Sequence, residues 1–230
     1  MAKTQKLEPD SGFHFLIKKP IDSLHYRSMG FLYEGWKCLL DLIIVIPTLI
    51  LIWPLFLLVI IIIKLDSPGP IIHRRRVVGR YGREFDAFKF RTMFVDGDAI
   101  LANYPKLQAE LRQKQKLKCD PRVTEAGKFL RKTSLDELPQ LFNILRREMT
   151  LVGPRILTQP EIRFYGRHAG TLLSVTPGLT GLWQVSGRAD TTFAERVRLD
   201  MHYIHNWSPR LDMEIMARTI PAVINGRGAY

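Results

Sequence analysis

The sequence is poor in cysteine and has fewer acidic residues than basic ones. Only two cysteines, Cys38 and Cys119, occur among 230 residues, and they are far apart in the chain. They give no disulfide framework and no zinc-ligand spacing, so we expect the soluble part to lie in the reducing cytosol. The 22 acidic residues are outnumbered by 34 basic ones, and the net charge of +12 indicates anionic partners such as nucleotides or phospholipid surfaces.

Several other signals are missing from the sequence. No apolar core follows a basic start, so no signal peptide is expected, and residues 1–36 are predicted to form a loosely held arm. No recognised nucleic-acid-binding module is present, which argues against nucleic acid as the anionic partner. No repeated α/β nucleotide-binding unit is evident either, and this disfavours a conventional nucleotide-sugar glycosyltransferase.

One long hydrophobic run predicts a membrane helix. Residues 39–63 are almost wholly apolar, which matches the roughly 20 residues that a membrane helix needs. Trp53-Pro54 interrupts the run, and basic residues flank both of its ends. Since positive flanks favour the cytoplasm, a helix that enters, bends at Pro54 and leaves on the same side fits both features. A kinked helix that spans the membrane is the alternative.

The stretch from Ile71 to Met93 predicts a hairpin. Its FKFRTM segment alternates aromatic and basic residues, so Lys89 and Arg91 are expected on one face of a strand. The preceding basic cluster Arg74 to Arg76 fits contact with anionic headgroups. Asp96-Gly97-Asp98 imitates an Asp-x-Asp metal motif, but glycine between acids is an ordinary turn into a helix.

The segment from Arg131 to Arg155 carries the strongest chemical signal. Two adjacent carboxylates, Asp136 and Glu137, precede leucines spaced as in an amphipathic helix. Because Pro139 is tolerated only near a helix start, a helix beginning at residue 135 or 136 is predicted, with Asp136 at its positive end. The alternative is structural, since Ser134 and Glu137 match a capping box.

Taken together, several motifs resemble one family. SLDELPQL, LVGPR, PGLTGLWQVSGR and the closing GRGAY occur in the order seen in bacterial polyprenyl-phosphate phosphoglycosyl transferases with a single membrane helix. KFRTM and DPRVT also match, and the resemblance runs from about Lys37 to Tyr230. It implies an α+β fold with a small sheet, several interfacial amphipathic helices and one re-entrant membrane helix broken at Pro54. The domains implied are an arm (1–36), the membrane helix (37–66) and a catalytic domain (67–230).

The resemblance also implies the chemistry and its residues. Asp136 is expected to be the nucleophile that forms an aspartyl phosphosugar, and Glu137 is expected to ligate Mg²⁺. Residues expected to bind substrate phosphates are Lys89, Arg91, Arg131, Arg155 and Arg188. The family usually continues Pro-Arg-Pro, whereas Ile156 follows Arg155 here, so the shape of this loop is less well defined than its arginine.

The resemblance finally implies substrates, partners and location. The donor is expected to be a UDP-sugar, with a hexose favoured by the RGAY ending, and the acceptor a polyprenyl phosphate. Anionic membrane lipid is the expected surface partner, and the oligomeric state stays open, a homodimer included. The expected location is the bacterial inner membrane, with both termini cytoplasmic. The rival hypotheses are a membrane-anchored basic adaptor and a glycosyltransferase that uses Asp96 and Asp98.

Overall fold

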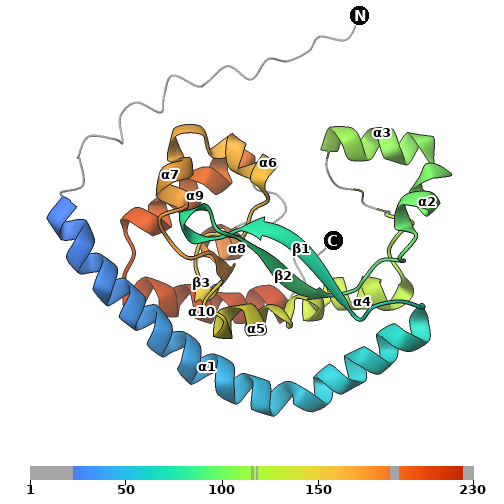
Figure 1. The fold of residues 1–230 in the computed structure, drawn as a ribbon, viewed down its shortest axis with the longest axis horizontal. Helices are drawn as coiled ribbons and strands as arrows, with labels where there is room; N and C mark the ends of the chain where they lie inside the picture. Colours follow the sequence, from blue (N-terminus) through green and yellow to red (C-terminus); the bar gives the residue numbers. More distant parts are fainter. Residues whose placement is uncertain (1–22, 115–116, 118, 187–191, 225–230) are drawn as a thin grey trace, which may run out of the picture. The chain divides into compact units, whose positions relative to one another are not determined.

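The computed structural model describes residues 23–114, 117, 119–186 and 192–224. The chain divides into two units, Met1–Gly35 and Trp36–Tyr230. In the first unit, residues 23–35 form the opening turns of helix α1 (Ser23–Asp66). The second unit contains the rest of α1 and all the other elements (Figure 1), and its mixture of helices and small sheets confirms the predicted α+β class.

Helix α1 continues through the predicted break. It contains Pro47 and Pro54 without losing its helical assignment, and between residues 36 and 66 it curves as an arc (Figure 1). An interior proline removes one hydrogen bond and bends a helix without having to end it. The stretch Leu32–Asp66 is long and apolar enough to cross a membrane, by length and composition.

The part of α1 in the second unit buries one side and exposes the other. Val45, Val59 and Ile63 are almost fully buried. Val45 packs with the hairpin and α5, while Val59 and Ile63 pack with Phe90 and Leu130. Large exposed apolar side chains cover the opposite side, namely Ile43, Ile50, Leu51, Trp53, Leu57, Leu58 and Ile61. Such a continuous apolar surface indicates contact with lipid or with another protein.

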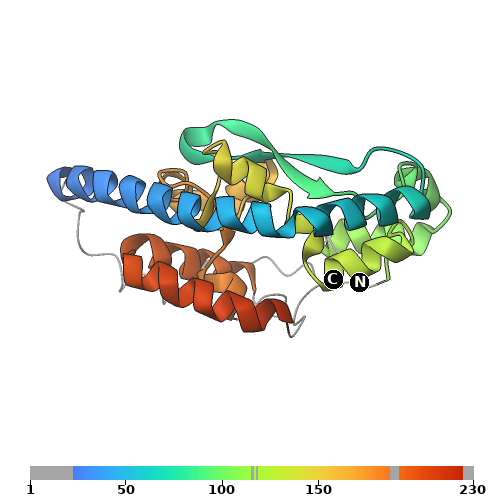
Figure 2. The ribbon, with the colours of Figure 1, turned by 90° about the horizontal axis from the view of Figure 1, so that it is seen from below.

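The predicted hairpin is confirmed. Strands β1 (Ile72–Val78) and β2 (Glu84–Phe90) are antiparallel, with Ile72 opposite Phe90 and Val78 opposite Glu84. A short 3₁₀ turn η2 (Arg80–Gly82) joins them. Figure 2 shows the hairpin and helix α10 (Pro209–Ile224) on opposite sides of α1.

A helical segment follows the hairpin and leads to the central motif. It comprises α2 (Gly97–Ala102), α3 (Pro105–Lys114) and α4 (Glu125–Lys132), then the 3₁₀ turn η3 (Leu135–Glu137) and α5 (Gln140–Leu145). Asp96 stands at the N-cap of α2, so the Asp-Gly-Asp segment is the turn that the sequence predicted. Thr124 caps α4 by accepting a hydrogen bond from the N–H of Gly127.

The C-terminal part begins with three short helical elements, α6 (Gln159–Ile162), η4 (Arg163–His168) and α7 (Ala169–Leu172). Gly166 has a φ of 49° and interrupts the helical path. Strand β4 (Gly178–Thr180) follows and pairs in parallel with β3 (Thr150–Val152).

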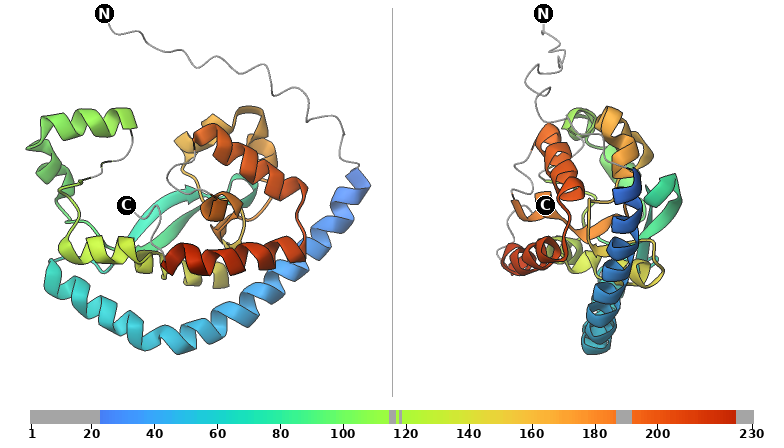
Figure 3. Two further views of the ribbon diagram at one scale, coloured as in Figure 1. Left: turned by 180° about the vertical axis from the view of Figure 1, so that it is seen from behind. Right: turned by 90° about the vertical axis from the view of Figure 1, so that its left-hand side faces the viewer.

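Three helices complete the unit: α8 (Leu182–Ser186), α9 (Phe193–His205) and α10. Figure 3 shows α9 and α10 from behind. A buried carboxylate, Asp212 of α10, accepts hydrogen bonds from Lys37 (2.7 Å), Tyr203 (2.7 Å) and the indoles of Trp36 and Trp207. These bonds fasten the start of this part of α1 to the C-terminal helices.

Candidate active site

The two central carboxylates lie in a 3₁₀ turn and not in the first turn of a long helix. Ser134 has a left-handed backbone (φ 57°), η3 covers Leu135–Glu137, and α5 begins only after Pro139. The helix predicted to start at residue 135 or 136 is therefore wrong: proline stands at the N-cap of α5, where its missing N–H costs nothing. The Ser134 side chain makes no capping bond, which removes the capping-box interpretation of Glu137.

Glu137 receives two cations from distant strands. The Nζ of Lys89, at the end of β2, lies 2.5 Å from Oε1 of Glu137, and Nη2 of Arg155, after β3, lies 3.4 Å from the same oxygen. Burial by itself raises the pKa of Glu137, but the charges of Lys89 and Arg155 outweigh it and hold the pKa at about 2. Glu137 is thus ionised at any physiological pH.

Asp136 has a different environment. It is 8% exposed, its Oδ2 lies 3.8 Å from Nζ of Lys89, and it accepts no hydrogen bond from the residues that the structure describes. Burial raises the pKa of Asp136 to about 6, with Lys89 opposing the shift and the Glu137 charge adding to it. The group is therefore mostly ionised near neutrality yet more basic than an ordinary aspartate, as a nucleophile or base at pH 7 requires.

Arg131 comes to the same place from α4. Its Nε donates to Oγ1 of Thr92 at 2.9 Å, which fixes the side chain. Burial lowers the pKa of Arg131, and the nearby Asp136 charge opposes that shift. Among the predicted residues, the structure thus gathers Lys89, Arg131 and Arg155 around the Asp136–Glu137 pair.

Two predicted residues, Arg91 and Pro54, do not belong to this cluster. Strand β2 ends at Phe90, and the guanidinium of Arg91 instead donates to the backbone oxygens of Pro68 and Ser67, where it ties down the segment after α1. Pro54 lies in the interior of α1. Arg188 lies outside the described residues.

Close backbone packing places Arg155. The N–H of Gly178 donates to the oxygen of Pro154 at 2.7 Å, and the N–H of Gly153 donates to the oxygen of Thr180 at 2.9 Å. A Cβ on Gly178 would lie 2.1 Å from the Gly153 nitrogen, so only glycine allows this approach. The LVGPR and PGLTG motifs are thus two sides of one small parallel pairing that presents the arginine.

Asn143 is a site residue that motif reading missed. It is fully buried on α5; its Oδ1 accepts from the N–H of Phe88 at 3.0 Å, and its Nδ2 donates to the oxygen of Asp86 at 2.8 Å. The amide therefore pairs with strand β2 as a neighbouring strand would, one residue before Lys89. The only sequence signal was a polar residue on the apolar side of a predicted helix.

The two adjacent carboxylates could supply oxygen ligands to a hard cation. Among the described residues no group of three or more metal-ligating side chains occurs. Mg²⁺ is commonly held by one or two carboxylates together with substrate phosphates and water, and the adjacent Asp136 and Glu137 fit that pattern. The alternative Asp96 and Asp98 do not, because Asp98 is fully exposed and faces Arg122 at 3.8 Å.

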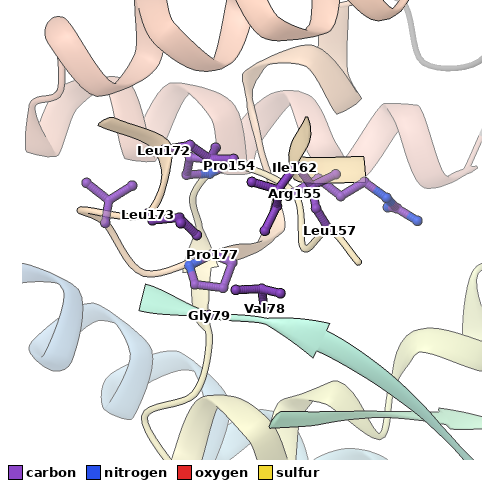
Figure 4. A pocket seen from close by; sticks show the side chains of 10 residues that line it. Val78, Gly79, Pro154, Arg155, Leu157, Ile162, Leu172, Leu173 and Pro177 are labelled. Atoms are coloured by element: carbon purple, nitrogen blue, oxygen red, sulfur yellow. The ribbon is translucent and has the colours of Figure 1, made fainter. Parts of the chain in front are cut away.

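Two further features contribute no group to the carboxylate cluster. Arg75 pairs with Glu161, and Arg76 pairs with Glu84 and Asp86, so these arginines already have partners. A shallow hollow lined mainly by apolar residues lies beside Arg155, which contributes to its lining. Figure 4 shows the Arg155 side chain extending away from its apolar lining.

Comparison with known proteins identifies relatives of this chain. The sequence profile of the family described as "Bacterial sugar transferase" matches residues 32–226. The chain is 47% identical over 194 residues to "Exopolysaccharide production protein ExoY" of Sinorhizobium fredii, covering 83% of this chain and 86% of that protein.

Two larger proteins also match. The chain is 41% identical over 213 residues to "Undecaprenyl-phosphate galactose phosphotransferase" of Salmonella typhimurium. It is 39% identical over 206 residues to "UDP-glucose:undecaprenyl-phosphate glucose-1-phosphate transferase" of Xanthomonas campestris pv. campestris. These alignments cover 91% and 84% of this chain but only 44% and 40% of those proteins.

Proposed function

The chain belongs to the bacterial sugar transferase family, and from that premise we propose that it transfers a sugar 1-phosphate from a UDP-sugar to a polyprenyl phosphate and releases UMP. Relatives named for galactose and glucose phosphotransfer to undecaprenyl phosphate support the reaction class, and the ExoY proteins support a role in exopolysaccharide production. The observation that carries the proposal is Asp136: a buried carboxylate of raised pKa beside a second carboxylate and three cations.

The proposed reaction has two displacements at phosphorus. A carboxylate oxygen of Asp136 attacks the phosphorus that bears the sugar, and the bond to the UMP oxygen breaks, so that UMP leaves with the electron pair. The phosphate oxygen of the lipid then attacks the same phosphorus and Asp136 leaves. Each step exchanges one P–O bond for another, which suits a covalent carboxylate intermediate.

The cations and Glu137 have separate tasks in this proposal. Two polyanionic substrates must approach two carboxylates, so Lys89, Arg131 and Arg155 are needed to offset negative charge during transfer. Glu137 accepts the contacts of Lys89 and Arg155, which orients both cations and leaves Asp136 without a hydrogen bond among the described residues. Bound Mg²⁺ would supply further charge neutralisation at the transferring phosphoryl group.

We also propose that α1 does not span the bilayer and that the catalytic unit lies on the cytoplasmic face. Val45 and Ile63 both pack on the same body, although about 27 Å of helix rise separates them. A helix spanning a bilayer about 30 Å thick would place such positions near opposite faces. The proposal includes two partners for the catalytic unit, namely anionic membrane lipid and a second copy of the chain in a homodimer.

The test is a purified protein in detergent given UDP-glucose or UDP-galactose. UMP release that depends on polyprenyl phosphate supports the transferase, whereas a glycosyltransferase would release UDP and an adaptor neither nucleotide. Without the lipid, a mass increase of one phosphosugar is expected on the peptide containing Asp136. Asp136→Asn should abolish both signals and Asp98→Asn should change neither. An adduct on another residue, or activity in Asp136→Asn, would contradict the covalent assignment.

A further inference from the structure

A tryptophan beside the active site lies against two arginines. Trp183 of α8 is buried, and the guanidinium carbon of Arg155 lies 5.8 Å from its ring centroid. The guanidinium carbon of Arg196, from α9, lies 4.6 Å from the same centroid. Stacking on an aromatic face leaves the N–H groups at the edge of a guanidinium available to an anion.

The two arginines differ in their partners. Arg155 reaches Glu137. The side chain of Arg196 makes no ion pair or hydrogen bond with any residue of the described part of the chain, and its Nε is buried without a partner. Burial lowers the pKa of Arg196 and the charge of Arg155 lowers it further, while Tyr165, Glu161 and Asp200 oppose the shift without forming a hydrogen bond or ion pair with its side chain. Holding an unpaired cation beside a second cation is costly, which calls for an anion that binds there.

The nearest carboxylate on the same helix does not serve as the anion for Arg196. Asp200, one turn after Arg196, is fully buried and accepts a hydrogen bond from the Tyr165 hydroxyl at 2.6 Å, with no ion pair to Arg196. Burial raises the pKa of Asp200 to about 7, so near neutrality it carries only part of a charge. Arg196 is itself only partly buried and can be reached from solvent.

We propose that Arg196, stacked on Trp183 next to Arg155, binds a phosphoryl anion of the substrates. The inference rests on the proposed function and adds a residue to it. Glu137 offsets the charges of Lys89 and Arg155. The guanidinium of Arg196 shares Trp183 with Arg155 but forms an ion pair neither with Glu137 nor with another carboxylate of the described residues. The anion is either the diphosphate of the UDP-sugar or the phosphate of the polyprenyl acceptor.

Steady-state kinetics with Arg196→Gln distinguish these sources. The KM for the UDP-sugar rises if Arg196 binds the diphosphate, and the KM for the polyprenyl phosphate rises if it binds the acceptor. Loss of a charged hydrogen-bond partner predicts a rise of about tenfold or more, with a smaller change in kcat. Arg198→Gln is the matched control on the same helix, where the side chain is exposed, and it should leave both KM values unchanged.

The result that overturns the inference is a folded Arg196→Gln protein with both KM values within twofold of the parent. If that variant does not fold, Arg196→Lys replaces it: a single ammonium keeps the charge but loses the fork of donors, so one KM should still rise about threefold or more. Unchanged KM values in Arg196→Lys would then overturn the inference. Absence of UMP release by the parent protein would instead reject the proposed function, so the two failures are distinguishable.

Discussion

At the scale of single residues, two adjacent carboxylates acquire opposite acid strengths. Both are largely buried, and burial raises the pKa of each. Glu137 takes the close contacts of Lys89 and Arg155 and its pKa falls to about 2, whereas Asp136 has only Lys89 at 3.8 Å and its pKa rises to about 6. Such divergence within one pair separates a charged, orienting group from a more basic, reactive one.

The pH dependence of the first displacement follows from Asp136. Its protonated form cannot attack phosphorus, so the single-turnover rate of UMP release should fall as the pH drops through about 6. Because the charge of Lys89 lowers the pKa of Asp136, Lys89→Met should raise that pKa and move the acid limb to higher pH. The measurement is the rate between pH 5 and 9 in both proteins.

An exposed lysine provides the control for this shift. Lys128 is exposed and pairs with Glu125 on α4, so Lys128→Met should leave the midpoint where it is in the parent protein. An acid limb that moves to lower pH in Lys89→Met would show that Lys89 does not favour the ionised form of Asp136.

At the scale of helices and strands, the sequence predicts the elements that depend on local residue patterns. The hairpin and the last two long helices follow from alternation and helical periodicity. Arg91 was expected beside Lys89 because alternation puts them on one strand face, but β2 ends at Phe90 and the side chain turns to backbone oxygens instead. The three-residue pairing of β3 with β4 joins distant backbone segments, and no local pattern records such a contact.

The same reasoning explains which site residues were found. Asp136, Glu137, Lys89, Arg131 and Arg155 were found because contiguous motifs contain them. Asn143 and Arg196 act through contacts with β2 and with Trp183, partners that are distant or offset in sequence. A single polar residue in a helix does not reveal such contacts.

The junction of α5 with β2 gives a prediction at the element scale. Asn143→Ala removes the partners of the Phe88 N–H and the Asp86 oxygen in a buried place. Leaving two buried backbone groups unpaired should cost about 2–4 kcal/mol and loosen Lys89 at the strand end. The measurements are the thermal unfolding midpoint in one detergent and the rate of UMP release.

Asn103→Ala is the matched control for this change. Asn103 is exposed and its side chain makes one long bond, of 3.5 Å, to the oxygen of Ala99. Its removal should change stability by less than about 0.5 kcal/mol. If Asn143→Ala were equally mild, the buried amide would not be what holds β2 against α5.

At the scale of the whole molecule, the membrane helix and the catalytic unit fold against each other. Lys37, near the start of this part of α1, donates to Asp212 of α10, and Ile63, near its end, packs with Phe90 and Leu130. The side of the helix between these anchors carries exposed leucine, isoleucine and tryptophan. Lipid around that side would bury it, while both anchors keep the helix ends beside the active site.

The last prediction concerns this topology and Pro54. Proline lacks an N–H and bends a helix, so Pro54→Leu removes the bend at the middle of an apolar run long enough to span about 30 Å of hydrocarbon and leaves Pro47 as the remaining proline of the helix. Some Pro54→Leu molecules should therefore span the membrane. Spanning would separate one anchor from the catalytic unit, so activity should fall even though Pro54 lies outside the carboxylate cluster.

A cysteine introduced by Ser11→Cys, with Cys38 and Cys119 replaced by serine, reports the side of the membrane on which the N-terminal arm lies. A membrane-impermeant thiol reagent on whole cells should leave the parent and an Ile50→Leu control unlabelled and label the Pro54→Leu protein. Labelling of the parent would show that α1 spans the membrane.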